Sequence, residues 1–207
     1  GPLFAPEIEA EASQALRQLI TASRRSKSID NSLLEQVTKP IYTMTRELYP
    51  EVIGEPNVAG CMSFEDYDYV QPMRVAGLSL LIGKMADCSM PKLAKLGIAA
   101  ILMNIGYVSI PPDILAKTGL RTENEFQEIK KHPRIGYELL NRYSHLGPEV
   151  AEAVLQHHER CDGSGYPAGL KGSEISFFAK VIAIADTYYT LVSKRFYKKT
   201  VMPNEAI

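Results

Sequence analysis

The segment from Gln156 to Gly172, QHHERCDGSGYPAGLKG, constrains the fold more than any other part of the chain, because two adjacent histidines stand directly before a glycine-rich stretch. Neighbouring residues of a helix point about 100° apart. His157 and His158 can therefore face one small site only near a helix end, where side chains converge from different directions. Asp162 and Gly163 form a turn signal, and glycines adopt backbone conformations that other residues resist. We predict a helix that ends at the histidines and a compact loop folded over them.

Apolar residues recur at helical spacing along most of the chain, whereas strand-like alternation is scarce. This pattern predicts an all-α domain built as a helical bundle. The helix that follows Pro91 is apolar nearly all round and is predicted to be the central, buried one. Thr122 and Glu125 form a capping box, and the pair Pro111-Pro112 is expected to stop regular structure. The predicted helices cover residues 6–24, 33–48, 64–85, 91–105, 122–131, 135–140, 150–158 and 175–193.

Composition and charge exclude several classes of protein. The chain has 207 residues, of which 45% are hydrophobic, so it can bury one sizeable core. Its net charge of -1 draws it neither to a nucleic acid polymer nor to an anionic membrane surface. The cysteines are odd in number and unclustered, which argues against a disulfide framework and favours a cytoplasmic setting. No membrane span is expected, since Lys84, Lys95 and Lys180 break the longest apolar runs.

Three of the four histidines, His132, His157 and His158, lie beside predicted helix breaks. Neutral imidazoles together with a carboxylate suit divalent iron, manganese, zinc or nickel, and three imidazoles can hold one face of an octahedral ion. The alternative for each is an ordinary hydrogen-bonded histidine of the core or the surface, and both interpretations stay open. His145 lies in a polar turn and is assigned to the surface.

Two further positions could carry chemistry. Asp186 follows the apolar run of residues 178–185, where a carboxylate is costly to desolvate unless it meets a metal, a cation or hydrogen-bond donors. The alternative for Asp186 is an ordinary acid on the solvent-exposed face of the helix. Arg195 and Lys198 are three residues apart, so they are near each other on a helix or turn and could clamp phosphates. Their alternative is an exposed basic helix end.

The segment from His157 to Pro167, HHERCDGSGYP, with Gly169 and Gly172 after it, strongly resembles the signature of HD-GYP domains. The likeness extends to Lys131-His132-Pro133, to Asp186-Thr187-Tyr188 and to the stretch that holds Arg195 and Lys198. It covers roughly two thirds of the chain, from about Phe64 onward, and its loop motif is long enough to be specific. The resemblance implies an HD-superfamily helical bundle and descent from bacterial phosphodiesterases, which use two or three metals, typically iron or manganese, to cleave cyclic di-GMP. It implies no organic cofactor.

The chain departs from this pattern where the family has its eponymous histidine and aspartate. Those positions align with Met103 and Asn104, the lysine that follows them aligns with Tyr107, and an upstream histidine aligns with Gln71. A thioether is a poor ligand for hard or borderline cations, and Asn104 offers one neutral oxygen where a bridge between two ions needs two anionic ones. The losses are therefore concentrated in one part of the site.

By resemblance, one ion would be held from the positions of Gln71, Met103, Asn104 and Asp186, and only Asp186 keeps the family's residue type. The second ion would use the bridging carboxylate and His132, His157 and His158, and all three histidines survive. We expect at most one metal, on these histidines, with Asn104 or water as a weak further ligand. Without a bridge or a full second set of ligands, two-metal hydrolysis should be abolished or very weak.

Three functions stay open for such a domain. In the first, it senses cyclic di-GMP through Tyr166, Arg195 and Lys198, which match the family's GYP loop and phosphate-contacting positions. In the second, the loop docks a signalling protein, such as a diguanylate cyclase-type domain, and the residues expected at that surface are Asp162, Gly163, Gly165, Tyr166 and Pro167. In the third, it is an active phosphodiesterase with unusual metal ligands.

The chain opens with Gly-Pro-Leu in place of methionine, and residues 204–207 read as the start of another helix, so we expect part of a longer protein. Residues 1–60 are predicted to be a helical segment that packs on the domain or dimerises, which leaves a homodimer open. Residues 61–207 are predicted to be a degenerate HD-GYP domain cut short at its C-terminus.

Overall fold

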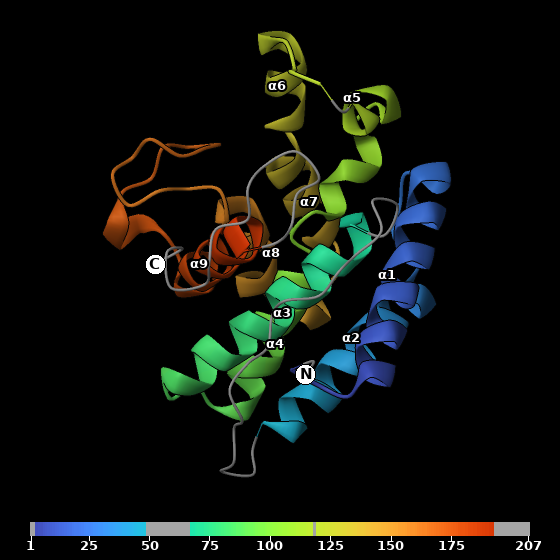
Figure 1. Cartoon of the computed structure of the whole chain (residues 1–207), viewed down its shortest axis with the longest axis vertical. Coiled ribbons are helices and arrows are strands. Elements are labelled where there is room, and N and C mark those ends of the chain that lie inside the picture. Colours follow the sequence, from blue (N-terminus) through green and yellow to red (C-terminus); the bar gives the residue numbers. More distant parts are fainter. Residues whose placement is uncertain (1–2, 49–66, 118, 193–207) are drawn as a thin grey trace.

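Helices make up the regular structure of the computed structural model, which describes residues 3–48, 67–117 and 119–192 (Figure 1). Within those residues the β-type pairing is a single isolated bridge between Asp162 and Lys171. The prediction of an all-α fold is confirmed. The α-helices are α1 (Pro6–Ser26), α2 (Asn31–Glu47), α3 (Tyr67–Met85), α4 (Met90–Ile101), α5 (Pro112–Ala116), α6 (Glu123–Ile129), α7 (His132–Leu140), α8 (Pro148–Gln156) and α9 (Phe177–Val192), and three short 3-10 helices are η2 (Ile105–Ser109), η3 (Ser144–Leu146) and η4 (Gly172–Glu174).

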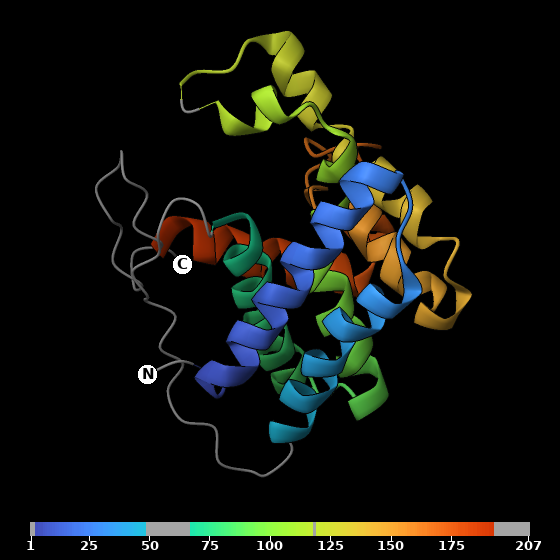
Figure 2. The same ribbon diagram turned by 90° about the vertical axis from the view of Figure 1, so that its right-hand side faces the viewer.

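Helix α4 lies at the centre of the bundle and contacts α2, α3, α8 and α9. Its residues from Leu93 to Ile101 are buried except for Lys95, as the nearly continuous apolar sequence predicts. Helices α1 and α2 form a hairpin along one side of α3 and α4, and they share one buried cluster with the rest of the bundle (Figures 1 and 2). Glu9 of α1 is buried and pairs with Arg74 of α3 at 3.0 Å, which ties this hairpin to the core.

Local signals explain most of the helix ends. The carboxylate of Asp30 accepts a hydrogen bond from the amide of Leu33 and caps α2, while Thr122 and Glu125 form the predicted capping box of α6. The prediction that Pro111-Pro112 stops regular structure is wrong, because α5 begins at Pro112. Proline fits the first turn of a helix, where its missing N–H would have no partner within the helix.

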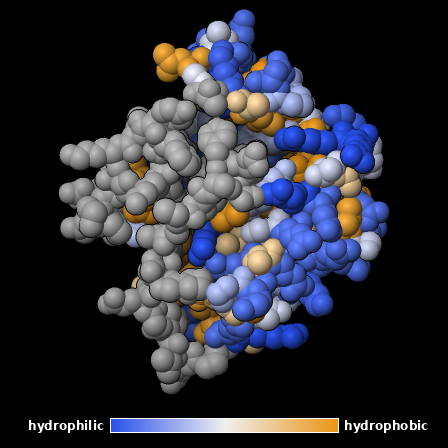
Figure 3. Space-filling view, turned by 45° about the vertical axis from the view of Figure 1, so that its right-hand side comes forward, coloured by the Kyte–Doolittle hydropathy of each residue, from blue (hydrophilic) through white to orange (hydrophobic). Residues whose placement is uncertain are grey.

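Helices α5 and α6, together called the arm, project from one end of the bundle in both views (Figures 1 and 2). Neither helix carries a buried residue. Leu120, between them, is 96% exposed, and Phe126 of α6 is also exposed. Figure 3 accordingly shows apolar side chains at the top of the molecule, where the arm lies. The right-hand side of the face below it is mostly hydrophilic.

By length and composition one stretch of the described residues, Met90–Ser109, could cross a membrane. The prediction that lysines break every such run is therefore wrong for this stretch, which is long and apolar enough although it contains Lys95. However, 72% of its apolar window is buried among the other helices, so its length and composition are weak evidence for a span. The stretch comprises the central helix α4 and the 3-10 helix η2 that leads to the candidate site.

Candidate functional site

The bundle brings together the three histidines that the sequence singled out. His132 is the first residue of α7, His157 caps the end of α8, and His158 follows it. Their candidate ligand nitrogens all lie within 4.8 Å of one another, and the Nε2 atoms of His132 and His157 are 3.3 Å apart. His132 and His157 are almost fully buried. We call these three residues the histidine cluster.

Backbone carbonyls determine the tautomers of two of these rings. The Nδ1 atom of His132 lies 2.7 Å from the carbonyl oxygen of Ile129, and that of His157 lies 2.7 Å from the carbonyl oxygen of Val154. A carbonyl oxygen only accepts, so each Nδ1 donates, and in a neutral ring Nε2 is left with a lone pair. The two Nε2 atoms are 3.3 Å apart, and their lone pairs face each other. Two lone pairs cannot form a hydrogen bond with each other, but both can bind one cation. The histidine cluster therefore fits a divalent metal ion.

Burial keeps the histidine cluster neutral. Desolvation, with the neighbouring His157, lowers the pKa of His132 from 6.5 to about 3, and desolvation lowers that of His157 to about 4. The pKa of His158 is also lowered, by burial and then by the other two rings. At neutral pH all three imidazoles thus carry no charge, which is the form that coordinates metals.

Two tyrosines flank the histidine cluster. The ring of Tyr107, in η2, lies 4.3 Å from that of His132, and the ring of Tyr166 stacks on His158 at 4.7 Å and 22°. Tyr166 is partly buried, so it is less open to a partner protein than the docking prediction assumed. Burial, followed by the nearby charge of Asp186, raises the pKa of the Tyr166 hydroxyl, which therefore stays protonated at neutral pH.

The backbone of η2 touches α7 directly beneath the histidine cluster. A Cβ atom on Gly106 would lie 1.9 Å from the carbonyl oxygen of His132 and 2.8 Å from the amide nitrogen of Gly136. Any side chain at this position would push η2 away from α7. The position of Tyr107 against His132 therefore depends on a glycine at the residue before it.

Asp186 does not belong to the histidine cluster, whose candidate ligand atoms lie within 4.8 Å of one another. One of its carboxylate oxygens accepts a hydrogen bond of 2.6 Å from the side-chain amide of Gln71, which joins α9 to α3. Gln71 is nearly buried and Asp186 is partly buried. Met103 is buried in the core, while Asn104 is partly exposed and stands directly before η2. Neutral groups thus occupy three of the four positions where the resemblance places the other ion, and Asp186 is the fourth.

The glycine loop, residues 159–172, is anchored by a carboxylate that the sequence did not single out. Glu159 is 4% exposed, and its two oxygens accept hydrogen bonds from the amides of Ala168 at 2.7 Å and Leu170 at 3.0 Å. The amide of Tyr166 donates to the carbonyl of His158 at 3.2 Å, which closes the loop over the histidine cluster. An acid directly after the paired histidines was the available signal, but its burial depends on how the loop folds.

The other predicted loop residues occupy its outer part. Asp162 is exposed and accepts hydrogen bonds from Ser164, while Gly163 has a φ of 82°. A Cβ atom on Gly165 would lie 2.4 Å from the amide nitrogen of Arg160, so the loop closes only with glycine there. The peptide bond between Tyr166 and Pro167 is cis. The predicted phosphate contacts Arg195 and Lys198 lie outside the described residues.

Comparison with known proteins identifies the family. The family model described as HD domain matches residues 13–207. The chain belongs to the HD domain family. The prediction of an HD-GYP domain is likewise supported, since the loop signature, the helical fold and the relatives described next agree.

Three comparisons illustrate this kinship. The chain is 41% identical over 130 residues to the cyclic di-GMP phosphodiesterase response regulator RpfG of Xanthomonas campestris pv. campestris, covering 61% of this chain and 34% of that protein. It is 36% identical over 171 residues to a cyclic di-GMP phosphodiesterase of Thermotoga maritima, and the match covers 80% of this chain and 45% of that protein. The structure of Bd1817, an HDG"Y"P protein from Bdellovibrio bacteriovorus, matches with a TM-score of 0.68 and 16% identity over 96% of this chain and 62% of that one, which shows the shared fold. The chain thus spans less than half the length of the two sequence relatives.

Proposed function

We propose that this chain is an HD-GYP domain of cyclic di-GMP signalling that binds the nucleotide and no longer hydrolyses it by the two-metal route. In this proposal one divalent metal is held by His132, His157 and His158. The hydrogen bond between Gln71 and Asp186 is the observation that carries the proposal, because it shows a neutral amide, which is a weak metal ligand, facing the one carboxylate left on the opposite side of the site.

The charges at the site disfavour hydrolysis. Two-metal hydrolysis of a phosphodiester needs a second ion to stabilise the leaving oxygen, and a carboxylate that bridges both ions. Here Asp186 is paired with the amide of Gln71, Met103 is buried in the core, and Asn104 is neutral. A single ion on the histidine cluster would polarise a phosphate oxygen, and it has no partner ion to share the developing charge.

The intact half of the site favours binding of the nucleotide. The stacked pair of His158 and Tyr166, with the tyrosine hydroxyl protonated, offers an aromatic surface and a hydrogen-bond donor next to the proposed metal. Several relatives carry the name cyclic di-GMP phosphodiesterase, which supports this nucleotide as the ligand. We also propose a cytoplasmic setting, because the described cysteines Cys88 and Cys161 are both free.

A second candidate is a protein-docking module, favoured by the glycine loop. Glu159 holds this loop in shape through two backbone hydrogen bonds, so the loop presents a defined surface whether or not an ion is bound. Asp162 and Ser164 at its tip are exposed to a partner. A diguanylate cyclase-type domain is the kind of partner we would test first.

One set of experiments separates these functions. Metal content is measured on the purified chain, cyclic di-GMP is titrated calorimetrically, and the products are analysed after incubation with added Fe²⁺ or Mn²⁺. We expect about one metal per chain, a measurable heat of binding and no linear dinucleotide. Linear product that disappears in His157→Ala would establish an active phosphodiesterase with unusual ligands. Absence of binding at high micromolar nucleotide would leave docking, tested by a pull-down sensitive to Tyr166→Ala.

A further inference from the structure

Lys130, at the end of α6, places a positive charge on the edge of the candidate site. Its ammonium lies 5.5 Å from the ring centroid of Tyr166 and 4.6 Å from that of Phe126. Cations are attracted to aromatic faces at such distances. Because Tyr166 in turn stacks on His158, Lys130 is connected to the histidine cluster through a single ring.

The lysines near Lys130 form ion pairs, whereas Lys130 forms none with the residues that the structure describes. Lys117 forms an ion pair of 2.6 Å with Glu125, and Lys131 pairs with Glu128. Among the residues that the structure describes, no carboxylate pairs with the ammonium of Lys130. A helix C-terminus favours any lysine through its dipole, but the dipole does not direct the ammonium onto a ring from another segment.

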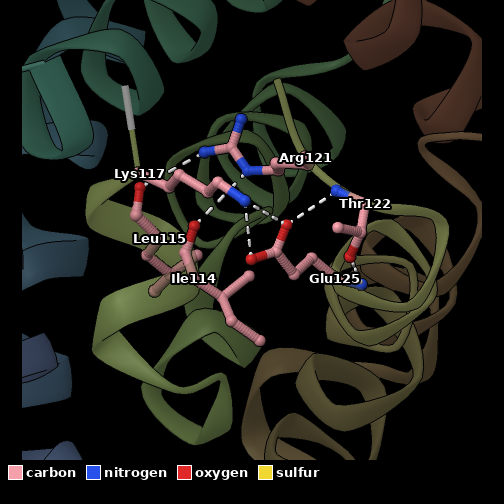
Figure 4. A network of polar contacts seen from close by, with 6 residues as sticks. All are labelled: Ile114, Leu115, Lys117, Arg121, Thr122 and Glu125. Atoms are coloured by element: carbon pink, nitrogen blue, oxygen red, sulfur yellow. Dashed lines mark hydrogen bonds and ion pairs between the residues drawn. The ribbon is translucent and has the colours of Figure 1, made fainter. Parts of the chain in front are cut away.

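A network of polar contacts joins the start of α6 to α5 (Figure 4). The ammonium of Lys117 contacts both carboxylate oxygens of Glu125, and one of these also accepts the amide of Thr122. The guanidinium of Arg121 donates to the carbonyls of Ile114 and Leu115 at the end of α5. At its other end α6 leads directly into α7, whose first residue, His132, is two positions after Lys130. Both ends of α6 are therefore fixed.

We infer that Lys130 is a ligand-contacting residue, whose ammonium binds a phosphate of a nucleotide held over Tyr166 and the histidine cluster. This inference rests on the proposed function. Such a ligand would lie on the stacked rings of His158 and Tyr166, and the ammonium reaches this surface over the face of Tyr166. Beside the proposed metal, a phosphate diester at this edge gains from a second positive charge. An ammonium that is attracted by two aromatic faces, and that pairs with no carboxylate of the described residues, can supply it.

The test compares calorimetric titrations of cyclic di-GMP into the Mn²⁺-loaded chain and three variants. Lys130→Met keeps the packing of the side chain against the rings and removes the charge, and Lys130→Arg keeps the charge. Lys131→Met is the matched control, because it removes a charge one residue away that Glu128 already neutralises. Thermal melting and metal content of the same samples report whether the arm and the histidine cluster are intact.

We expect affinity to fall about tenfold in Lys130→Met, and to stay within about threefold of wild type in Lys130→Arg and Lys131→Met. Added salt should weaken binding to the wild type more than binding to Lys130→Met, since it screens the contact that the variant has lost. Wild-type affinity in Lys130→Met, or equal losses in both methionine variants, would overturn the inference and leave the proposed function standing. A wild-type chain without affinity would overturn both.

Discussion

The side-chain amide of Gln71 on α3 donates a 2.6 Å hydrogen bond to the carboxylate of Asp186 on α9, across 115 positions of sequence. In Gln71→Glu the donor becomes a second carboxylate, and like charges at this distance repel. We expect the free energy of unfolding at pH 8 to fall by about 1–3 kcal/mol, measured by urea denaturation. The loss of stability should shrink toward pH 5, because one of the two carboxyl groups is then protonated and its O–H donates a hydrogen bond to the other. Added Mn²⁺ should also reduce the loss.

The control for this substitution is Gln18→Glu, which introduces the same charge at an exposed position of α1. Its unfolding energy should stay within about 0.5 kcal/mol of wild type at both pH values. If Gln71→Glu matches this control, the hydrogen bond to Asp186 contributes nothing measurable to stability.

Metal binding should depend on the facing Nε2 atoms of the histidine cluster. In His157→Ala one ligand and its oriented lone pair are lost, so we expect the chain to lose its bound metal. A metal at a hundred times its dissociation constant stabilises a protein by about 2.7 kcal/mol, so the wild type should melt at a higher temperature with metal and the variant should not. His145→Ala, outside the histidine cluster, should behave as wild type. Equal metal content in both variants would exclude this site.

The stability of the metal-free chain should fall as the pH is lowered from about 6.5 toward 4. Unfolded histidines take up protons near pH 6.5, whereas folded His157 and His132 resist protonation down to about pH 4 and 3. In that window the unfolded state binds more protons, so acid favours unfolding by up to about 1.4 kcal/mol per pH unit for each buried histidine. Urea denaturation across this range measures the slope, and His132→Gln should reduce it. A flat profile would show that these rings are protonated in the folded state.

Gly106 should tolerate no side chain. In Gly106→Ala the new methyl group would meet the carbonyl of His132 at 1.9 Å, so η2 and α7 must separate. We expect a loss of about 3 kcal/mol or more in unfolding free energy. Gly119→Ala is the matched control, because a Cβ there meets nothing within 4 Å, and it should change stability by less than about 1 kcal/mol. Equal effects of the two substitutions would contradict the close contact.

The shape of the glycine loop should depend on Glu159. In Glu159→Gln an NH₂ group replaces one of the two oxygens that accept the amides of Ala168 and Leu170, so one buried N–H loses its acceptor at a cost of about 1–3 kcal/mol. Hydrogen exchange at these two amides should accelerate. Glu174→Gln, at an exposed carboxylate that accepts the amide of Lys171, is the control and should leave both amides protected. Unchanged exchange in Glu159→Gln would mean that other contacts hold the loop.

Much of the fold was predictable, because it depends on local signals. Apolar periodicity marked the long helices, and the capping box of Thr122 and Glu125 marked the start of α6. The paired histidines indicated a helix end, since adjacent helical residues diverge. Each of these signals lies within a few residues of the structure that it predicts.

The parts that were missed depend on contacts between distant segments. Gln71 was interpreted as a lost ligand, and only the packing of α3 against α9 reveals that its amide binds Asp186. Glu159 and Lys130 are charged residues of a kind usually exposed, and their roles follow from the fold of the glycine loop above them. The short helix α5 differs from the prediction because a proline also fits the first turn of a helix, and consecutive prolines alone do not distinguish a helix start from a helix stop.

His132 and His157 are each oriented by the carbonyl three residues earlier in the chain, which belongs to Ile129 at the end of α6 for the first ring and to Val154 of α8 for the second. The separation of their Nε2 atoms consequently reflects how the junction of α6 and α7 lies against α8. The visible absorption of a Co²⁺ ion bound at this position would depend on the geometry of its histidine ligands. It would therefore report relative movement of these segments, because the rest of the protein does not absorb visible light.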